Sequence, residues 1–203
     1  MMRLLFVFLA AAIPALGGGF QFPSAGSSQS PDGNWKLTCK SPGKRATDAC
    51  HSLRLKKIHG KTFKLRRFDR GCDALWSPDS SWIALTDWLA SDMSDVFIYS
   101  VANPGSGKSL GNLFTKGVIP DKERKGHCYF EATKWLDTHR LEIKVFGHTD
   151  ESPVYGFEHH YIFDLTTGQL ARRKKKPDQP ATNEERALPN SCASVSELIS
   201  PYA

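Results

Sequence analysis

One short motif occurs twice in this chain of 203 residues, and it is the strongest constraint on the fold. Ser-Pro-Asp is followed three residues later by Trp, first at Ser30 to Trp35 and again at Ser77 to Trp82. The offset between the two copies is 77 − 30 = 47 residues. Serine favours the first position of a type I turn and proline presets the second, so each copy predicts a tight turn that leads into a strand. Repetition with a period of about 40 to 50 residues is typical of blades or solenoid units.

Strand patterns follow each of these turns. Residues 53–56 and 63–66 alternate apolar with basic side chains around His59-Gly60, as a half-exposed hairpin does. Residues 96–99 are apolar throughout, which indicates a strand covered on both faces. A third, weaker copy starts at Trp135 and continues through residues 141–145 and 161–164. No segment of helical length has an apolar period of 3.6 residues, so the sequence predicts an all-β fold.

The second copy, LWSPDSSWIALTDWLASDMSDVFIYSV, resembles the propeller repeat of TolB-type periplasmic proteins. In that repeat an aromatic-Ser-Pro-Asp-Gly turn leads one strand and an Asp-aliphatic-Tyr strand follows. Here Ser80 replaces the glycine, and the third copy has Leu136-Asp137-Thr138 in place of the turn. A closed propeller has at least about four blades. Three repeated hairpin units within residues 30–170 therefore predict a partial β-propeller or an open β-sandwich, or a subunit that completes itself by association.

The two ends of the chain differ in composition from this region. Residues 1–19 combine Arg3, an apolar run of about 12 residues and small residues, which is typical of a secretory signal peptide and too short to span a membrane. Residues 20–29 are expected to form a flexible lead-in. The five basic residues 172–176 open a segment, 171–203, that is predicted to be a disordered basic linker and tail. The chain is therefore expected to be exported to the periplasm or the extracellular space. We expect a monomer in which residues 191–203 dock on the third unit and cover its strand edge.

Five cysteines in an exported chain predict disulfides rather than metal thiolates. Cys39 and Cys50 flank a loop between two predicted strands, and we expect them to be bonded. Cys72 and Cys128 precede Trp76 and Trp135 and form the candidate second pair. Cys192 is left over.

No cofactor or metal site is expected. Residues 102–109 fit a relaxed phosphate-loop pattern, but Gly111, Gly117 and Pro120 interrupt the helix that such a loop requires, so a hairpin loop is the better interpretation. The adjacent His159 and His160 should point to opposite faces of a strand, which weakens a histidine metal site. The basic run carries no interleaved aromatic residues, so nucleic acid is not an expected partner.

Two hypotheses for function remain open. The first is a non-enzymatic binding or scaffold protein that uses loops on a β framework, with a protein or an anionic envelope polymer as its partner. Trp88 is the candidate exposed contact residue. The alternative is a cell-envelope hydrolase with a His/Asp/Glu cluster from residues 121–128 and 147–160. A single pocket that gathers these side chains would favour the hydrolase.

Overall fold

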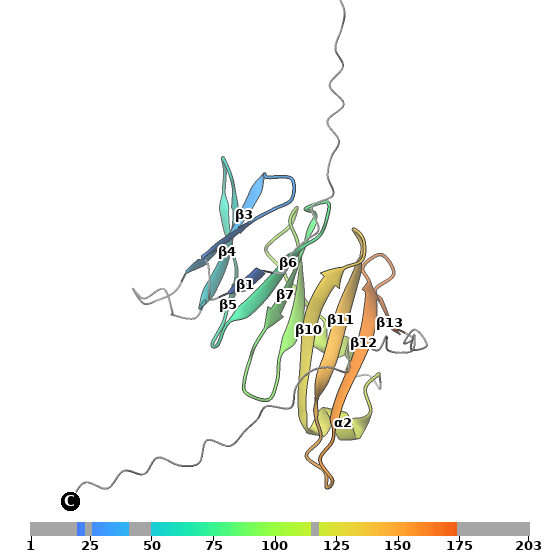
Figure 1. Ribbon diagram of the computed structural model, residues 1–203. Helices are drawn as coiled ribbons and strands as arrows, with labels where there is room; N and C mark the ends of the chain where they lie inside the picture. Colours follow the sequence, from blue (N-terminus) through green and yellow to red (C-terminus); the bar gives the residue numbers. More distant parts are fainter. Residues whose placement is uncertain (1–19, 23–25, 41–49, 115–117, 174–203) are drawn as a thin grey trace, which may run out of the picture. The chain divides into compact units, whose positions relative to one another are not determined.

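The computed structural model describes residues 20–22, 26–40, 50–114 and 118–173, and these form an all-β fold of three antiparallel sheets (Figure 1). The first sheet runs in chain order: β2 (Ser27–Gln29), β3 (Trp35–Lys40), β4 (Ser52–Lys57) and β5 (Thr62–Arg67). The third is also a simple meander: β10 (His127–Trp135), β11 (Arg140–His148), β12 (Gly156–Asp164) and β13 (Gln169–Arg172). The expected third repeat is therefore present as a complete sheet.

The middle sheet combines the second repeat with a strand from the N-terminal side. In spatial order it holds β1 (Phe20–Phe22), β6 (Cys72–Trp76), β7 (Trp82–Asp87), β8 (Asp95–Ser100) and β9 (Lys108–Ser109). Two short helices, α1 (Gly111–Phe114) and α2 (Asp121–Lys125), lie between β9 and β10. No helix in the described parts of the chain is long and apolar enough to cross a membrane.

Strands extend across two of the predicted boundaries. The expected flexible lead-in, 20–29, contains β1, which pairs with β6, and β2, which pairs with β3. At the other end, β13 includes Ala171 and Arg172, and the Arg173 amide donates a hydrogen bond to the His160 carbonyl oxygen. Backbone pairing with an existing sheet edge thus orders residues whose composition favours a linker. The predicted signal peptide and residues 174–203 lie outside the described residues.

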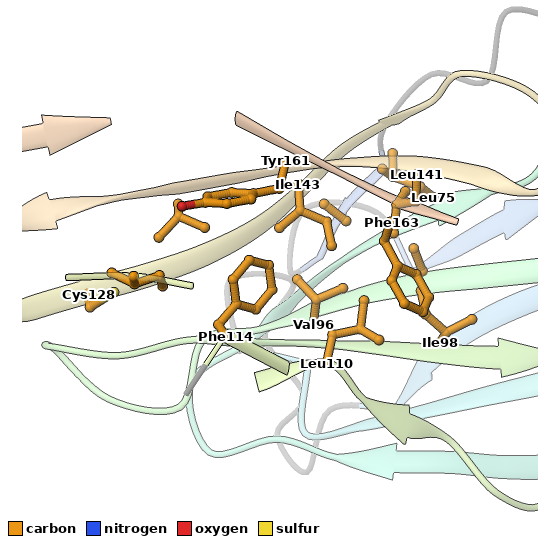
Figure 2. Close-up of a cluster of buried hydrophobic side chains, with 14 residues drawn as sticks. Leu75, Val96, Ile98, Leu110, Phe114, Cys128, Leu141, Ile143, Tyr161 and Phe163 are labelled. Carbon is orange, nitrogen blue, oxygen red and sulfur yellow. The ribbon is translucent and has the colours of Figure 1, made fainter. Parts of the chain in front are cut away.

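Two hydrophobic clusters hold the three sheets together, and the middle sheet contributes to both. One cluster joins Leu37, Leu53 and Leu55 of the first sheet to alternate residues of β6, β7 and β8. The other joins the opposite face of the middle sheet to Leu141, Ile143, Tyr161 and Phe163 of the third sheet (Figure 2). Strand β8 shows this directly, because Phe97 and Tyr99 belong to the first cluster whereas Val96 and Ile98 belong to the second. The prediction that residues 96–99 are covered on both faces is confirmed.

The segment after β9 adds side chains to the second cluster that no repeat supplies. Leu110, Phe114 and Ile119 are almost completely buried. The Phe114 ring meets Tyr161 edge to face, with ring centroids 5.4 Å apart, and stacks on Phe130 at 4.7 Å (Figure 2 shows Phe114 and Tyr161). This segment therefore fills space between the middle and third sheets.

One of the two predicted disulfides is present and the other is not. Cys39 and Cys50 form a disulfide with Cα atoms 5.5 Å apart, although the strand partner of Cys39 is Leu53 and Cys50 precedes β4. Cys72 and Cys128 are both free and buried, so the predicted second bridge is wrong. Cys72 lies in the first cluster and Cys128 in the second, on opposite sides of the middle sheet, so their sulfur atoms cannot meet. Cys192 lies outside the described residues.

Candidate binding groove

The two Ser-Pro-Asp turns have the same hydrogen-bond geometry. In each, the serine amide donates to the tryptophan carbonyl oxygen and the tryptophan amide donates to the serine Oγ, all at 2.9 Å for Ser30 with Trp35 and for Ser77 with Trp82. Each serine hydroxyl then donates to the carboxylate of the following aspartate, at 2.5 Å for Asp32 and 2.6 Å for Asp79. The repeated motif therefore specifies a rigid turn, as the sequence predicts.

The third unit keeps part of this geometry with different residues. The Leu136 amide donates to the Arg140 carbonyl oxygen, and Asp137 accepts the amide hydrogens of His139 and Arg140. One further backbone hydrogen bond occurs in all three units at 2.9 Å. The amide of the residue that follows a later strand of the unit donates to a carbonyl oxygen of the turn. The pairs are Ile58 with Asn34, Val101 with Ser81, and Leu165 with His139. The third turn is thus a shortened member of the same series.

The turns border three adjoining cavities, which we call the turn-side groove. The central cavity, about 500 Å³, is lined by residues of all three turns together with Ser100, Val101 and Ala102. A second cavity of about 490 Å³ shares Trp35, Val101 and Ala102 with it, and a third of about 200 Å³ shares Trp82 and Ser100. Trp35 and Trp82, both half-buried, therefore separate neighbouring lobes of the groove.

The central lobe carries negative charge. Burial alone would raise the pKa of Asp32, but hydrogen bonds from Ser30, Asn34 and Ser80 outweigh it, and the net pKa lies below the usual value. The same holds for Asp79, where bonds from Ser77 and Ser81 outweigh burial and lower the pKa. Both carboxylates are therefore ionised at neutral pH and are held by their own turns, which suits fixed charge better than proton transfer.

The flanking lobes carry positive charge. Lys57, Lys61 and His59 line the second cavity beside Trp35 and Phe63, and Lys108 lines the third beside Phe163. The Lys57 ammonium lies 5.8 Å from the Trp35 ring centroid, and the Lys108 ammonium 5.6 Å from the Phe163 ring centroid. The groove thus presents basic, acidic and basic lobes in sequence, separated by tryptophan rings.

The histidines of the alternative hypothesis do not form one site. His159 Nε2 lies 2.9 Å from Glu123, and His159 Nδ1 lies 2.7 Å from Arg172. His160 contacts Glu142 and Glu158 on the other face of β12. His127 and His148 are cross-strand partners whose rings stack with centroids 4.2 Å apart. Within the described residues, no group of three or more His, Cys, Asp or Glu side chains is placed to hold a metal ion.

Trp88 is less accessible than predicted. Its indole Nε1 donates to Asp73 at 2.8 Å, its ring centroid lies 6.3 Å from that of Tyr129, and the side chain is half-buried. The groove tryptophans were missed as contact residues because turn-adjacent tryptophans are usually core residues. The recurrence of Trp at the same position of each turn was the available signal.

Comparison with protein-family models, curated proteins and solved structures finds no match to this chain.

Proposed function

We propose that this chain is an exported, non-enzymatic binding protein whose turn-side groove holds an extended segment of a partner protein. The observation that carries the proposal is the pair of half-buried tryptophans, Trp35 and Trp82, between adjoining cavities of opposite charge. Tryptophan is enriched in protein interfaces and often provides most of the binding free energy. Ionised carboxylates and lysines beside these rings would select charges on the partner.

The order of the charged lobes in the groove predicts the order of charged residues in the partner segment. A segment that crosses the groove would place a basic residue near Asp32 and Asp79 and acidic residues toward Lys57 and Lys108. Export is supported by the disulfide between Cys39 and Cys50, because such bonds persist in oxidising compartments. The TolB-type resemblance remains part of the proposal, and three antiparallel sheets, each a consecutive run of strands apart from β1, support it. The hydrolase alternative has less support, because its histidines are divided between two faces of β12 and a separate stacked pair.

Site-specific photo-crosslinking tests the proposed groove. A photoreactive amino acid replaces Ala102, which is exposed and lines two lobes, and a matched variant carries it at Gln169, which is exposed on β13. In extracts of the native host, Ala102 should crosslink a protein segment with the acidic-basic-acidic pattern, and Gln169 should not. Equal crosslinking at both positions, or none at Ala102, would overturn the proposal.

A further inference from the structure

The described side chains on the outer face of the first sheet include positive charges and no negative charge. Residues 37, 53 and 55 point into the first cluster, so the residues that alternate with them point away from it. Among the described side chains, this outer face presents five cations: Lys36, Arg54, Lys56, Lys64 and Arg67. Its remaining described positions are neutral and polar: Ser27, Gln29, Thr38, Ser52 and Thr62. We call this surface the basic face.

Two pairs of like charges lie directly opposite each other on the basic face. Lys36 is the cross-strand partner of Lys56, and Arg54 is the cross-strand partner of Lys64. Directly opposed residues have Cβ atoms about 4.5–5.5 Å apart, and like charges at that separation destabilise a sheet. Each of these two cross-strand pairs therefore destabilises the sheet, whereas a neutral or acidic residue in place of one cation would not.

No ion pair within the described structure neutralises these five cations, whereas several charged residues of the other strands form ion pairs. On the third sheet, Lys144 Nζ lies 2.6 Å from Glu131, and Glu142 contacts Lys134 and Arg173. Even Arg66, which points to the opposite face of β5, bonds to Asp87 at 2.5 Å. In addition, Arg54 Nε is buried without a hydrogen-bond partner. An anion that binds the basic face would supply the missing charge.

The chemistry of the basic face selects the class of anion. Neighbouring strands are about 4.8 Å apart and same-face residues of one strand are roughly 6.6 Å apart, so the cations lie close together across three strands, with a register shift between Leu53 and Arg54. The face has no aromatic residue for stacking on nucleic-acid bases. It also has no apolar side chain to insert into a lipid bilayer. Gln29, Thr38 and Thr62 offer hydrogen-bonding groups between the cations.

We propose that the basic face binds a linear anionic polysaccharide, whose carboxylate or sulfate groups pair with the cations while its hydroxyl groups bond to the threonine and glutamine side chains. This site is separate from the turn-side groove. Failure of the proposed protein partner would therefore leave this proposal unaffected, and the reverse also holds.

The test compares two variants of equal charge. Arg54→Gln with Lys64→Gln removes two cations from the basic face. Arg70→Gln with Lys125→Gln removes two exposed cations elsewhere, and the basic residues 172–176 are common to both. Titration with a heparin dodecasaccharide should show about tenfold weaker binding for the first variant and a shallower dependence of affinity on salt, since fewer counterions are released. The second variant should bind within twofold of the unchanged protein.

Two outcomes would overturn the proposal. One is an equal loss of affinity in both variants, which would assign the binding to net charge. The other is binding of single-stranded DNA or of anionic lipid vesicles as strong as that of the dodecasaccharide.

Melting temperature provides an independent readout. At low salt the first variant should melt at or above the temperature of the unchanged protein, because repulsion is relieved. A melting temperature lower than that of the second variant would contradict the premise.

Discussion

Ser80 shows how one residue connects two of the repeated turns. Its φ of 64° lies in the left-handed region that Gly33 occupies in the first turn, with φ of 74°. A residue with a Cβ atom is strained in this conformation by roughly 1–2 kcal/mol. The Asp32 amide donates to Ser80 Oγ at 2.9 Å, so the serine provides a bond between the first and second turns that glycine could not.

Substitutions at Ser80 should separate the strain from the bond. Ser80→Ala keeps the strain and loses the bond, which should reduce the free energy of unfolding by about 1 kcal/mol. Ser80→Gly loses the bond but relieves the strain, so it should retain more stability than Ser80→Ala by about 1 kcal/mol. Urea denaturation measures both variants. If Ser80→Gly proved the less stable of the two, the strain would not be real.

The free cysteines show that a residue pattern does not determine which cysteines pair. Cysteine number and compartment predict disulfides, but the pairing of Cys72 with Cys128 depends on which face of a sheet each residue occupies. Burial raises the pKa of both thiols, to about 11 for Cys128, and both therefore behave as small apolar residues. The sheet face on which the Cys72 side chain lies follows from the pairing of Cys72 with Asp87 on β7. Local sequence does not specify this long-range contact.

At the scale of elements, tryptophan side chains connect successive sheets. Trp76, at the end of β6, donates its indole hydrogen to Ser28 of β2 at 3.1 Å. Trp135, at the end of β10, donates to the Leu75 carbonyl oxygen of β6 at 3.3 Å. Since 75 − 28 = 47, Ser28 and Leu75 are equivalent positions of successive repeats. Each of these tryptophans thus binds the corresponding position of the preceding sheet.

Removal of one such bond should weaken the contact between two sheets. Trp135→Phe loses the indole donor and part of the ring, and should reduce the free energy of unfolding by about 1 kcal/mol beyond the effect of Trp35→Phe. Trp35 is also half-buried, but no hydrogen bond of its indole is present in the described structure. For a protein of this length that difference corresponds to roughly 2–4 °C in melting temperature. Equal melting temperatures for the two variants, measured by calorimetry, would contradict a connecting role.

Local sequence patterns predicted some strands and missed others for identifiable reasons. The hairpin of β4 and β5 and the buried strand β8 follow from alternation and from a continuous apolar run. Strand β10 has neither pattern, because a register shift between Ala132 and Lys134 interrupts its alternation. Strands β2 and β9 are only 3 and 2 residues long and exist through pairing with their neighbours. Short edge strands depend on tertiary contacts, which residue order alone does not reveal.

At the scale of the whole molecule, the candidate sites depend on contacts that sequence reasoning could not supply. The turns were predicted, but their gathering around one groove requires the packing of all three sheets. The same packing covers part of β12, because Tyr161 and Phe163 face the second cluster and β13 pairs with its edge. The predicted docking of residues 191–203 on the third unit concerns residues outside the described ones and stays a prediction.

The outer faces of the first and third sheets predict a monomer. Sheets pack on one another through apolar faces, as both internal clusters do here. The basic face has no large apolar side chain, and the outer face of the third sheet carries the ion pairs of Glu131 and Glu142. Closing a ring or stacking a second copy would remove these charges from water, and the half-buried rings of Tyr129 and Phe146 on the third sheet offer little apolar area to offset that cost.

Light scattering behind a sizing column checks this prediction, with the full chain at low and at high salt. A monomer is expected at both, because repulsion between basic faces opposes association at low salt and little apolar area favours it at high salt. Arg54→Gln with Lys64→Gln serves as the control, since it removes part of the repulsion and should also remain monomeric. A dimer of that variant would show that charge alone prevents association, and a dimer of the unchanged protein would show that the sheets complete one another between two copies.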